Sequence, residues 1–298
     1  MLLPFVAIVS VRRLIAGATL CALLPAVPAV AKDAEVLRAR HAALRAELAD
    51  NAFGRPLHVE SSGTAGQVYA TVGQPFAEVR PALRRMQHWC DILILPVNVK
   101  YCQASGAGSG DTLSVYIARK PADPLEDAYR VDFGYQVLAE RDDYLHVELS
   151  SADGPFGTRD YRISLEAAPL DARRTFLHMS YSYEPGMAAR VAMRLYLATS
   201  GRDKVGFSVV DRLPDGDPVY VDGVRGVVER NTMRYYLAVE AYLGALDEPP
   251  RQRLDKRLHD WHAAIERYPQ LRELERDEYL KLKRWEALRQ EVGVTSGR

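Results

Sequence analysis

The chain has 298 residues, and its 39 Lys and Arg residues balance its 39 Asp and Glu residues, so the formal net charge is zero. A neutral chain lacks the positive field that holds nucleic acid, which argues against a duplex-binding role. The length fits one large domain with extensions or two domains, and the 48% hydrophobic content excludes wholesale disorder.

The first 31 residues have the order of a secretory signal peptide. Arg12 and Arg13 precede an apolar stretch from Leu14 to Leu24, and Ala29-Val30-Ala31 has the A-x-A form of a cleavage site. We therefore predict a signal peptide over residues 1–31, cleavage after Ala31, and a periplasmic or secreted protein. An uncleaved membrane anchor is the alternative, although prolines and arginines interrupt any span of about 20 residues.

Cleavage would leave two cysteines, Cys90 and Cys102. In an oxidising compartment such a pair favours a disulfide, which would stabilise the fold by about 3 kcal/mol through loop closure. Two buried free thiols are the alternative. The C-x11-C spacing does not fit zinc, and His259 and His262 lack a third and a fourth ligand. We therefore predict no metal site and no cofactor.

After the leader, residues 32–54 predict an N-terminal helix with apolar positions at Val36, Leu37, Leu44 and Leu48. Strands are expected over 57–60 and 67–72, and short helices begin at Pro75 and Met86. Six strands then follow with short loops, which favours antiparallel pairing. They are expected over 97–103, 112–119, 129–139, 144–149, 161–167 and 175–183.

The period of two residues divides each strand into two faces. One face carries Tyr129, Val131, Phe133, Tyr135 and Val137, together with Leu145, Val147 and Leu149 and with Tyr161, Ile163 and Leu165. The same face of the next strand carries Leu177, Met179, Tyr181 and Tyr183. His146 and His178 are expected to point the other way.

The last third of the chain is mainly helical. We expect a short helix over 187–199, a last strand over 205–210, and a long amphipathic helix from Asp222 to Leu246. Its inward side carries Val224, Val228, Asn231, Thr232, Tyr235, Val239, Tyr242 and Leu246, and Glu229, Arg230, Arg234 and Glu240 lie on or near the outer side. Residues 248–298 predict a charged helical hairpin with the apolar stripe Leu254, Leu258, Trp261 and Ile265.

Three segments resemble the START-like superfamily, the helix-grip fold that includes polyketide cyclases and lipid-transfer domains. They are Gln67–Val79, Trp89 in His88-Trp89-Cys90-Asp91, and Gly223–Tyr236. The resemblance covers about Leu57 to Leu246 and implies a ligand-binding domain over 55–247. The implied fold is α+β: a curved antiparallel sheet closed by a long C-terminal helix, with helical N- and C-terminal extensions.

The resemblance and the inward faces together indicate a pocket for a hydrophobic ligand. Its predicted lining is Phe133, Tyr135, Met179, Tyr181, Tyr183, Val228, Asn231, Thr232, Tyr235 and Tyr242. Asn231 would be a polar anchor, or would bond to the sheet backbone or to a tyrosine. We predict a periplasmic binding or transfer protein for a hydrophobic small molecule, with a lipid as the expected ligand.

Two other functions stay open at this stage. A cyclase- or hydrolase-like enzyme could use the same cavity, but it would need an inward acid or base, and no catalytic residue can be assigned. An envelope assembly role would act through a protein partner bound to the C-terminal hairpin.

Overall fold

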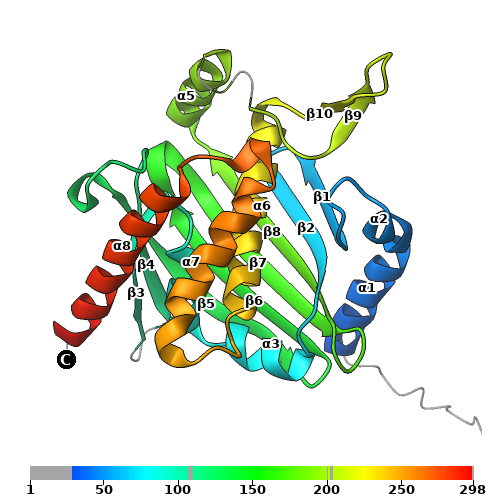
Figure 1. Ribbon diagram of the computed structural model, residues 1–298, viewed down its shortest axis with the longest axis horizontal. Helices are drawn as coiled ribbons and strands as arrows, with labels where there is room; N and C mark the ends of the chain where they lie inside the picture. Colours follow the sequence, from blue (N-terminus) through cyan, green and yellow to red (C-terminus); the bar gives the residue numbers. More distant parts are fainter. Residues whose placement is uncertain (1–28, 107–109, 200, 202–203, 297–298) are drawn as a thin grey trace, which may run out of the picture.

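Eight strands form one antiparallel sheet in the order β1-β2-β8-β7-β6-β5-β4-β3 (Figure 1). The computed structural model describes residues 29–106, 110–199, 201 and 204–296, so most of the predicted signal peptide lies outside the described residues. The strands are β1 (Leu57–Ser62), β2 (Ala65–Val72), β3 (Val99–Ser105), β4 (Thr112–Ile117), β5 (Tyr129–Arg141), β6 (Tyr144–Asp153), β7 (Thr158–Pro169) and β8 (Thr175–Pro185).

The chain crosses the sheet only once, between β2 and β3. Helices α3 (Phe76–Leu83) and α4 (Met86–Leu93) carry it from one side of the sheet to the far edge. Successive hairpins then bring it back until β8 pairs with β2, with Val68 opposite Met179. Helix α3 packs against β7, and α4 packs against β3 and β4, so that both helices contribute to the main core on one face of the sheet.

Helix α6 (Gly223–Leu243) closes the same face and packs against β1, β2 and β8. The approach is closest at Gly66 of β2. A Cβ atom at Gly66 would lie 2.9 Å from the carbonyl oxygen of Val228, and closer still to the Thr232 hydroxyl. Glycine is therefore required where the backbones of α6 and β2 meet. A sheet gripped by one long helix confirms the predicted α+β helix-grip fold.

The C-terminal hairpin folds back onto this domain. Its helices are α7 (Pro250–Glu266) and α8 (Arg276–Ser296), joined by η3 (Pro269–Leu271). Leu258, Trp261 and Ile265 of the predicted stripe are buried in the main core, and Leu254 packs against it. The stripe therefore serves the core of this chain.

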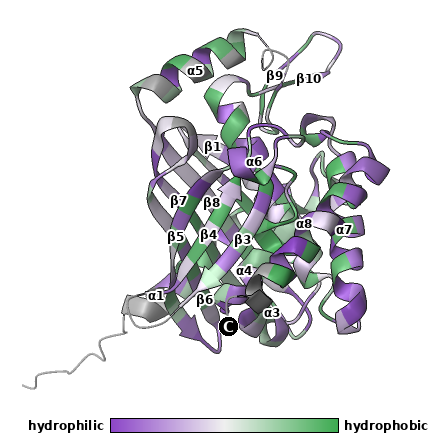
Figure 2. Cartoon of the chain, turned by 90° about the vertical axis from the view of Figure 1, so that its left-hand side faces the viewer, coloured by the Kyte–Doolittle hydropathy of each residue, from purple (hydrophilic) through white to green (hydrophobic). Residues whose placement is uncertain are grey.

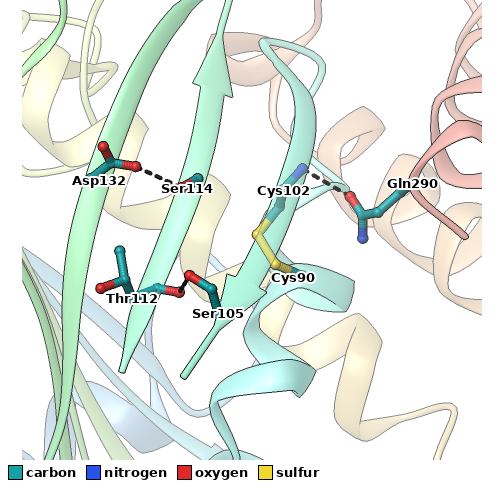
Figure 3. The surroundings of a disulfide bond; sticks show 7 residues. All are labelled: Cys90, Cys102, Ser105, Thr112, Ser114, Asp132 and Gln290. Carbon is teal, nitrogen blue, oxygen red and sulfur yellow. Dashed lines mark hydrogen bonds between the residues drawn. A yellow bond between two sulfur atoms is a disulfide. The ribbon is translucent and has the colours of Figure 1, made fainter. Parts of the chain in front are cut away.

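Helix α8 also covers the edge strand β3. Gln290 accepts a hydrogen bond from the Cys102 backbone N–H at 3.0 Å, as a neighbouring strand would (Figure 3). Lys283 donates to the carbonyl oxygen of Val99 at 2.7 Å and pairs with Glu286 at 2.6 Å, and all three residues are buried. These side chains satisfy backbone N–H and C=O groups of β3, which would otherwise be free to pair with a strand of another chain.

The predicted disulfide is confirmed. Cys90 of α4 is bonded to Cys102 of β3, with a Cα–Cα distance of 5.2 Å (Figure 3). The bond fixes α4 to the edge strand that α8 covers from outside.

The opposite face of the sheet is covered in part by α1 (Ala29–Ala43) and α2 (Arg45–Ala49) (Figure 2). A second core forms there from Ala34, Leu37, Leu44, Leu48, Tyr69, Tyr144, Ala168 and Phe176. The prediction for Val36 is wrong, since 59% of it is exposed. The other three predicted positions, Leu37, Leu44 and Leu48, are buried against the sheet.

His146 and His178 lie on this outer face, as predicted. His178 bonds Glu166 at 2.6 Å and Gln67 at 2.9 Å, and its ring stacks on Tyr69 with a centroid distance of 4.3 Å. His146 bonds the hydroxyl of Ser164 at 2.8 Å. Both side chains therefore belong to the hydrogen-bonded surface beside α1 and lie away from the gripped face.

The segment between β8 and α6 differs from the prediction. The expected last strand over 205–210 is not part of the main sheet. Instead β9 (Val209–Arg212) pairs with β10 (Pro218–Tyr220) in a separate hairpin, which projects from the same end of the molecule as α5 (Met187–Ala198) (Figure 1). Of the range 205–210, only Val209 and Val210 lie in a strand, and β2 and β8 already pair with each other, which leaves no place between them for another strand.

Candidate functional site

Four tyrosines gather on the gripped face near the end from which α5 leaves the sheet. Tyr161, Tyr181 and Tyr183 come from β7 and β8, and Tyr235 comes from α6. Ring centroids lie 5.5 Å apart for Tyr161 and Tyr183, 5.8 Å for Tyr161 and Tyr181, and 5.6 Å for Tyr181 and Tyr235. We call these four residues the tyrosine cluster. Phe133 adjoins it, with its ring 6.4 Å from that of Tyr161.

Tyr161 was not among the predicted lining residues. The signal was present, because alternation from Ile163 places Tyr161 on the inward face. The register confirms it, since Ile163 lies opposite Tyr181. The structure thus brings together Tyr181, Tyr183 and Tyr235 as predicted, with Tyr161 as a fourth member.

The hydroxyls of the tyrosine cluster are unequally satisfied. Tyr181 donates to the hydroxyl of Tyr161 at 3.3 Å. The hydroxyls of Tyr183 and Tyr235 make no hydrogen bond to any other described residue, and neither oxygen is sealed from solvent. A partly buried hydroxyl without a protein partner is available to a ligand.

Tyrosine hydroxyls, with an ordinary pKa of about 10, are neutral at physiological pH, and burial here disfavours their ionisation further. Burial raises the pKa of Tyr183 to about 12, and it raises that of Tyr235 further above the ordinary value. Both hydroxyls are therefore neutral at physiological pH and act as hydrogen-bond donors. The cluster offers two donors in an otherwise aromatic and aliphatic wall.

The other end of the grip is packed with the protein's own side chains. Tyr135 donates to the carbonyl oxygen of Leu83 at 3.1 Å, and the buried Trp89 donates to the same oxygen at 2.8 Å. The guanidinium of Arg257 lies 4.4 Å above the ring of Tyr242. Tyr135 and Tyr242 lie away from the tyrosine cluster. The Tyr135 hydroxyl has a hydrogen-bond partner, whereas in the described part of the chain Tyr242 has ring contacts only, with Arg257 and with His88, whose ring centroid is 5.7 Å away.

The remaining predicted residues divide between α6 and the core. Val228 and Thr232 face Gly66, and the Thr232 hydroxyl donates to the Val228 carbonyl at 2.7 Å. Asn231 is half-buried, and its side-chain oxygen accepts from Arg234 at 3.3 Å. Its hydrogen bond is therefore neither to the sheet backbone nor to a tyrosine. Met179 is buried opposite Leu165 in the main core.

The expected outer side of α6 is not exposed throughout. Glu229 is fully buried, and only 3% of Arg230 is exposed. The Glu229 carboxylate accepts hydrogen bonds from the backbone N–H groups of Phe207 and Ser208 at 2.6 and 2.9 Å. It also accepts from the hydroxyls of Ser61 and Ser208 at 2.6 and 2.7 Å. The prediction for these two residues is wrong because residues 204–208 fold back over α6.

This carboxylate does not face the gripped space. Its four donors come from the chain itself, which identifies a structural clamp between α6, β1 and the start of the β9–β10 hairpin. Most buried inward positions of β4 to β8 are apolar or tyrosine, and they include Leu113, Val115, Ile117, Val131, Phe133, Tyr135, Leu145, Val147, Leu149, Tyr161, Ile163, Leu165, Ala167, Leu177, Met179, Tyr181 and Tyr183. Ser151, opposite Tyr161, and Thr175 share this face, and their hydroxyls donate to the carbonyl oxygens of Asp153 and Gln74 at 2.9 and 2.8 Å. The polar groups at these positions are therefore all hydroxyls.

The histidine pair considered for metal binding has other partners. His262 bonds the carbonyl oxygen of Leu274 at 3.0 Å, and His259 lies 3.0 Å from a guanidinium nitrogen of Arg276. In the part of the chain that the structure describes, no three His, Cys, Asp or Glu side chains are grouped so as to hold a metal ion. No helix among the described residues is both long enough and apolar enough to cross a bilayer.

Two open hollows lie on the outer side of α8. One has a volume of about 570 Å³ and the other about 370 Å³, and both are lined by Lys281 and Trp285. The larger hollow is lined by α8 residues alone, and the smaller one lies between α8 and the segment at Pro121 and Ala122. None of the predicted ligand-binding residues lines either hollow.

Comparison with known proteins finds no matching family model and no match among curated proteins. Solved structures do show similarity. The Zhui aromatase/cyclase from Streptomyces sp. R1128 is 15% identical, with coverage of 70% of this chain and 96% of that one and a TM-score of 0.36. Norcoclaurine synthase from Thalictrum flavum is 14% identical, with coverages of 47% and 84% and a TM-score of 0.32. Human StAR-related lipid transfer protein 5 is 11% identical, with coverages of 57% and 89% and a TM-score of 0.31.

The names of these neighbours are those of two enzymes and a lipid transfer protein. At such identities and TM-scores they carry no statement about activity. The strand order and the place of α6 define this chain as a protein of the helix-grip fold. Its particular function has to be argued from the site.

Proposed function

We propose that the protein binds a hydrophobic small molecule at the tyrosine cluster and acts as a binding or transfer protein. The observation that carries this proposal is the pair of unpartnered hydroxyls of Tyr183 and Tyr235 in an otherwise apolar wall. The ligand class is an apolar body with one oxygen acceptor, as in a lipid with a carbonyl or carboxylate group. A periplasmic location is part of the proposal, supported by the leader sequence and by the Cys90–Cys102 bond.

The energetics favour such a ligand. Burial of apolar surface contributes about 25 cal/mol per Å², before the costs of ordering the complex. A ligand oxygen that accepts from Tyr183 or Tyr235 adds about 0.5–1.5 kcal/mol per hydrogen bond. Most of the affinity would come from the apolar body, and the tyrosines would select its orientation.

A catalytic role in the same space has less support. Cyclase or hydrolase chemistry needs an acid or a base that exchanges protons near neutral pH. The inward polar groups on β4 to β8 are tyrosine, serine and threonine hydroxyls, and burial raises the pKa of Tyr183 to about 12. These groups bind and orient an oxygen more readily than they remove a proton.

The test is a binding titration with a defined probe. Oleic acid would be titrated into the purified protein, with displacement of an apolar fluorophore as the readout and native mass spectrometry as the count of bound molecules. We expect the variant that combines Tyr183→Phe and Tyr235→Phe to bind oleic acid about tenfold more weakly, since two hydrogen bonds are lost. Each ring is retained, so the apolar wall is unchanged.

Tyr242→Phe is the matched control, because its ring lies beneath Arg257 at the other end of the grip. It should bind oleic acid as the wild type does. The proposal is wrong if the wild-type protein takes up neither oleic acid nor the fluorophore. The assignment to the tyrosine cluster is wrong if the double variant and Tyr242→Phe bind equally well.

A further inference from the structure

Helix α5 presents an apolar stripe to solvent. Met187, Val191 and Leu195 are 85%, 54% and 65% exposed, and their spacing of four residues places them along one side of the helix. Ala189, on the other side, is buried. The helix packs on η2 (Pro155–Gly157) and on the end of β8, and Gly186 donates a backbone hydrogen bond to Gly157 at 3.0 Å. The stripe therefore has no partner within the described part of the chain.

The charged residues of α5 itself have one sign. Arg190 and Arg194 are exposed on α5, and the sequence from Gly186 to Gly201 contains no Asp or Glu. Arg190 donates to the carbonyl oxygen of Pro185 at 3.1 Å, which holds its side chain at the start of the helix. In a chain whose charges balance overall, this is a local basic and amphipathic helix.

The neighbouring hairpin has the opposite character. Val209, Val210 and Leu213 are also exposed there, but acidic residues stand among and after them, at Asp211, Asp215 and Asp217. An anionic surface would therefore attract α5 and repel the β9–β10 hairpin. Helix α5 and the β9–β10 hairpin project from the same end of the molecule (Figure 1), and their sequences differ in charge.

We propose that α5 docks on the surface of an anionic lipid bilayer. The apolar stripe enters the boundary between headgroups and acyl chains, and the arginines pair with lipid phosphates. The inference is independent of ligand binding. If both proposals hold, docking places the end of the grip that carries the tyrosine cluster at the membrane, since Tyr183 precedes α5 by only a few residues.

The first experiment compares variants in vesicle sedimentation. The full chain would be mixed with vesicles of phosphatidylglycerol and phosphatidylethanolamine, or of phosphatidylcholine alone. Combining Met187→Gln with Leu195→Gln should weaken binding at least about tenfold, because two exposed apolar side chains no longer enter the bilayer. Arg194→Gln should weaken binding about fivefold, only with phosphatidylglycerol present.

Leu288→Gln is the matched control. Leu288 is 58% exposed on α8, away from α5, and its substitution should leave vesicle binding unchanged. Circular dichroism checks that every variant is folded. The proposal is overturned if the α5 variants bind like Leu288→Gln, or if the wild type does not prefer the anionic vesicles.

The second experiment locates the contact without relying on variants. Hydrogen–deuterium exchange of the wild-type protein with anionic vesicles should slow at amides of α5 and stay unchanged along α8. This readout separates α5 from any binding by the N-terminal leader. Unchanged exchange in α5 in the presence of anionic vesicles would refute the proposal. The apolar stripe would then have to be covered by a protein partner, which is a different function.

Discussion

The buried carboxylate of Glu229 gives the sharpest prediction about stability. Glu229→Ala removes the acceptor of four hydrogen bonds, two of them from backbone N–H groups at Phe207 and Ser208. The Ser208 hydroxyl can still donate to the carbonyl of Val59, at 3.2 Å. The two N–H groups have no such alternative, because their positions are fixed by the backbone.

The magnitude follows from those two donors. Each buried polar group left without a partner costs about 1–3 kcal/mol, so Glu229→Ala should reduce the free energy of unfolding by about 3–5 kcal/mol. Glu229→Gln keeps one acceptor oxygen and should cost less, about 2 kcal/mol. Urea denaturation followed by circular dichroism measures both values, provided that the slope of the transition is unchanged.

Glu140→Ala is the comparison that tests the reasoning. Glu140 pairs with Arg84 at 2.8 Å, but both side chains are exposed to solvent, so the loss should be no more than about 1 kcal/mol. Hydrogen exchange should also accelerate in residues 205–212 of Glu229→Ala. A Glu229→Ala variant as stable as Glu140→Ala would refute the clamp.

Three further predictions concern the frame of the grip. Gly66→Ala should destabilise the protein by about 2–4 kcal/mol, measured by urea denaturation, because its Cβ would meet the α6 backbone; a normal midpoint would contradict the close approach. Replacing Cys90 and Cys102 together by Ser should lower the unfolding free energy by about 3 kcal/mol, and reducing agent should then have no further effect. Burial lowers the pKa of Lys283 to about 8 from 10.5. The unfolded chain therefore holds more protons above pH 8, and the wild type should gain about 2 kcal/mol of stability between pH 8 and pH 10 relative to Lys283→Met; parallel pH profiles would disprove this.

The sequence was sufficient for the layers of the fold because two periods dominate it. Alternation in the β5 to β8 segments identified the inward face, and the helical period identified α6. The same reasoning placed Tyr181, Tyr183 and Tyr235 together. Tyr161 followed from the same alternation, although it was not singled out.

The rest depended on contacts between distant segments. A helical wheel places Glu229 on the outside of α6, and nothing local indicates that residues 204–208 return to cover it. In the sequence, Lys283 is one of many charged residues of a helix. In the structure it is buried, because α8 packs on the edge strand β3 and Lys283 donates a hydrogen bond to the carbonyl oxygen of Val99. Polar residues that are buried by a returning chain cannot be recognised from periodicity, since their pattern is that of a solvated face.

The placement of the ligand rests on two tyrosine hydroxyls without a partner among the described residues, those of Tyr183 and Tyr235, whose rings both contact Tyr181. The α3–α4 end offers one such hydroxyl, that of Tyr242, whose ring lies beneath Arg257. At the α3–α4 end, Tyr135 and Trp89 share the Leu83 carbonyl, and a disulfide fixes α4 to β3. At the other end, the side chains of Tyr183 and Tyr235 make ring contacts with neighbouring tyrosines, and their hydroxyls make no hydrogen bond to another described residue. Neither hydroxyl is sealed from solvent, so water can satisfy it in the free protein, and a ligand oxygen can take the place of that water. Their presence is explained if a ligand oxygen completes the hydrogen bonds.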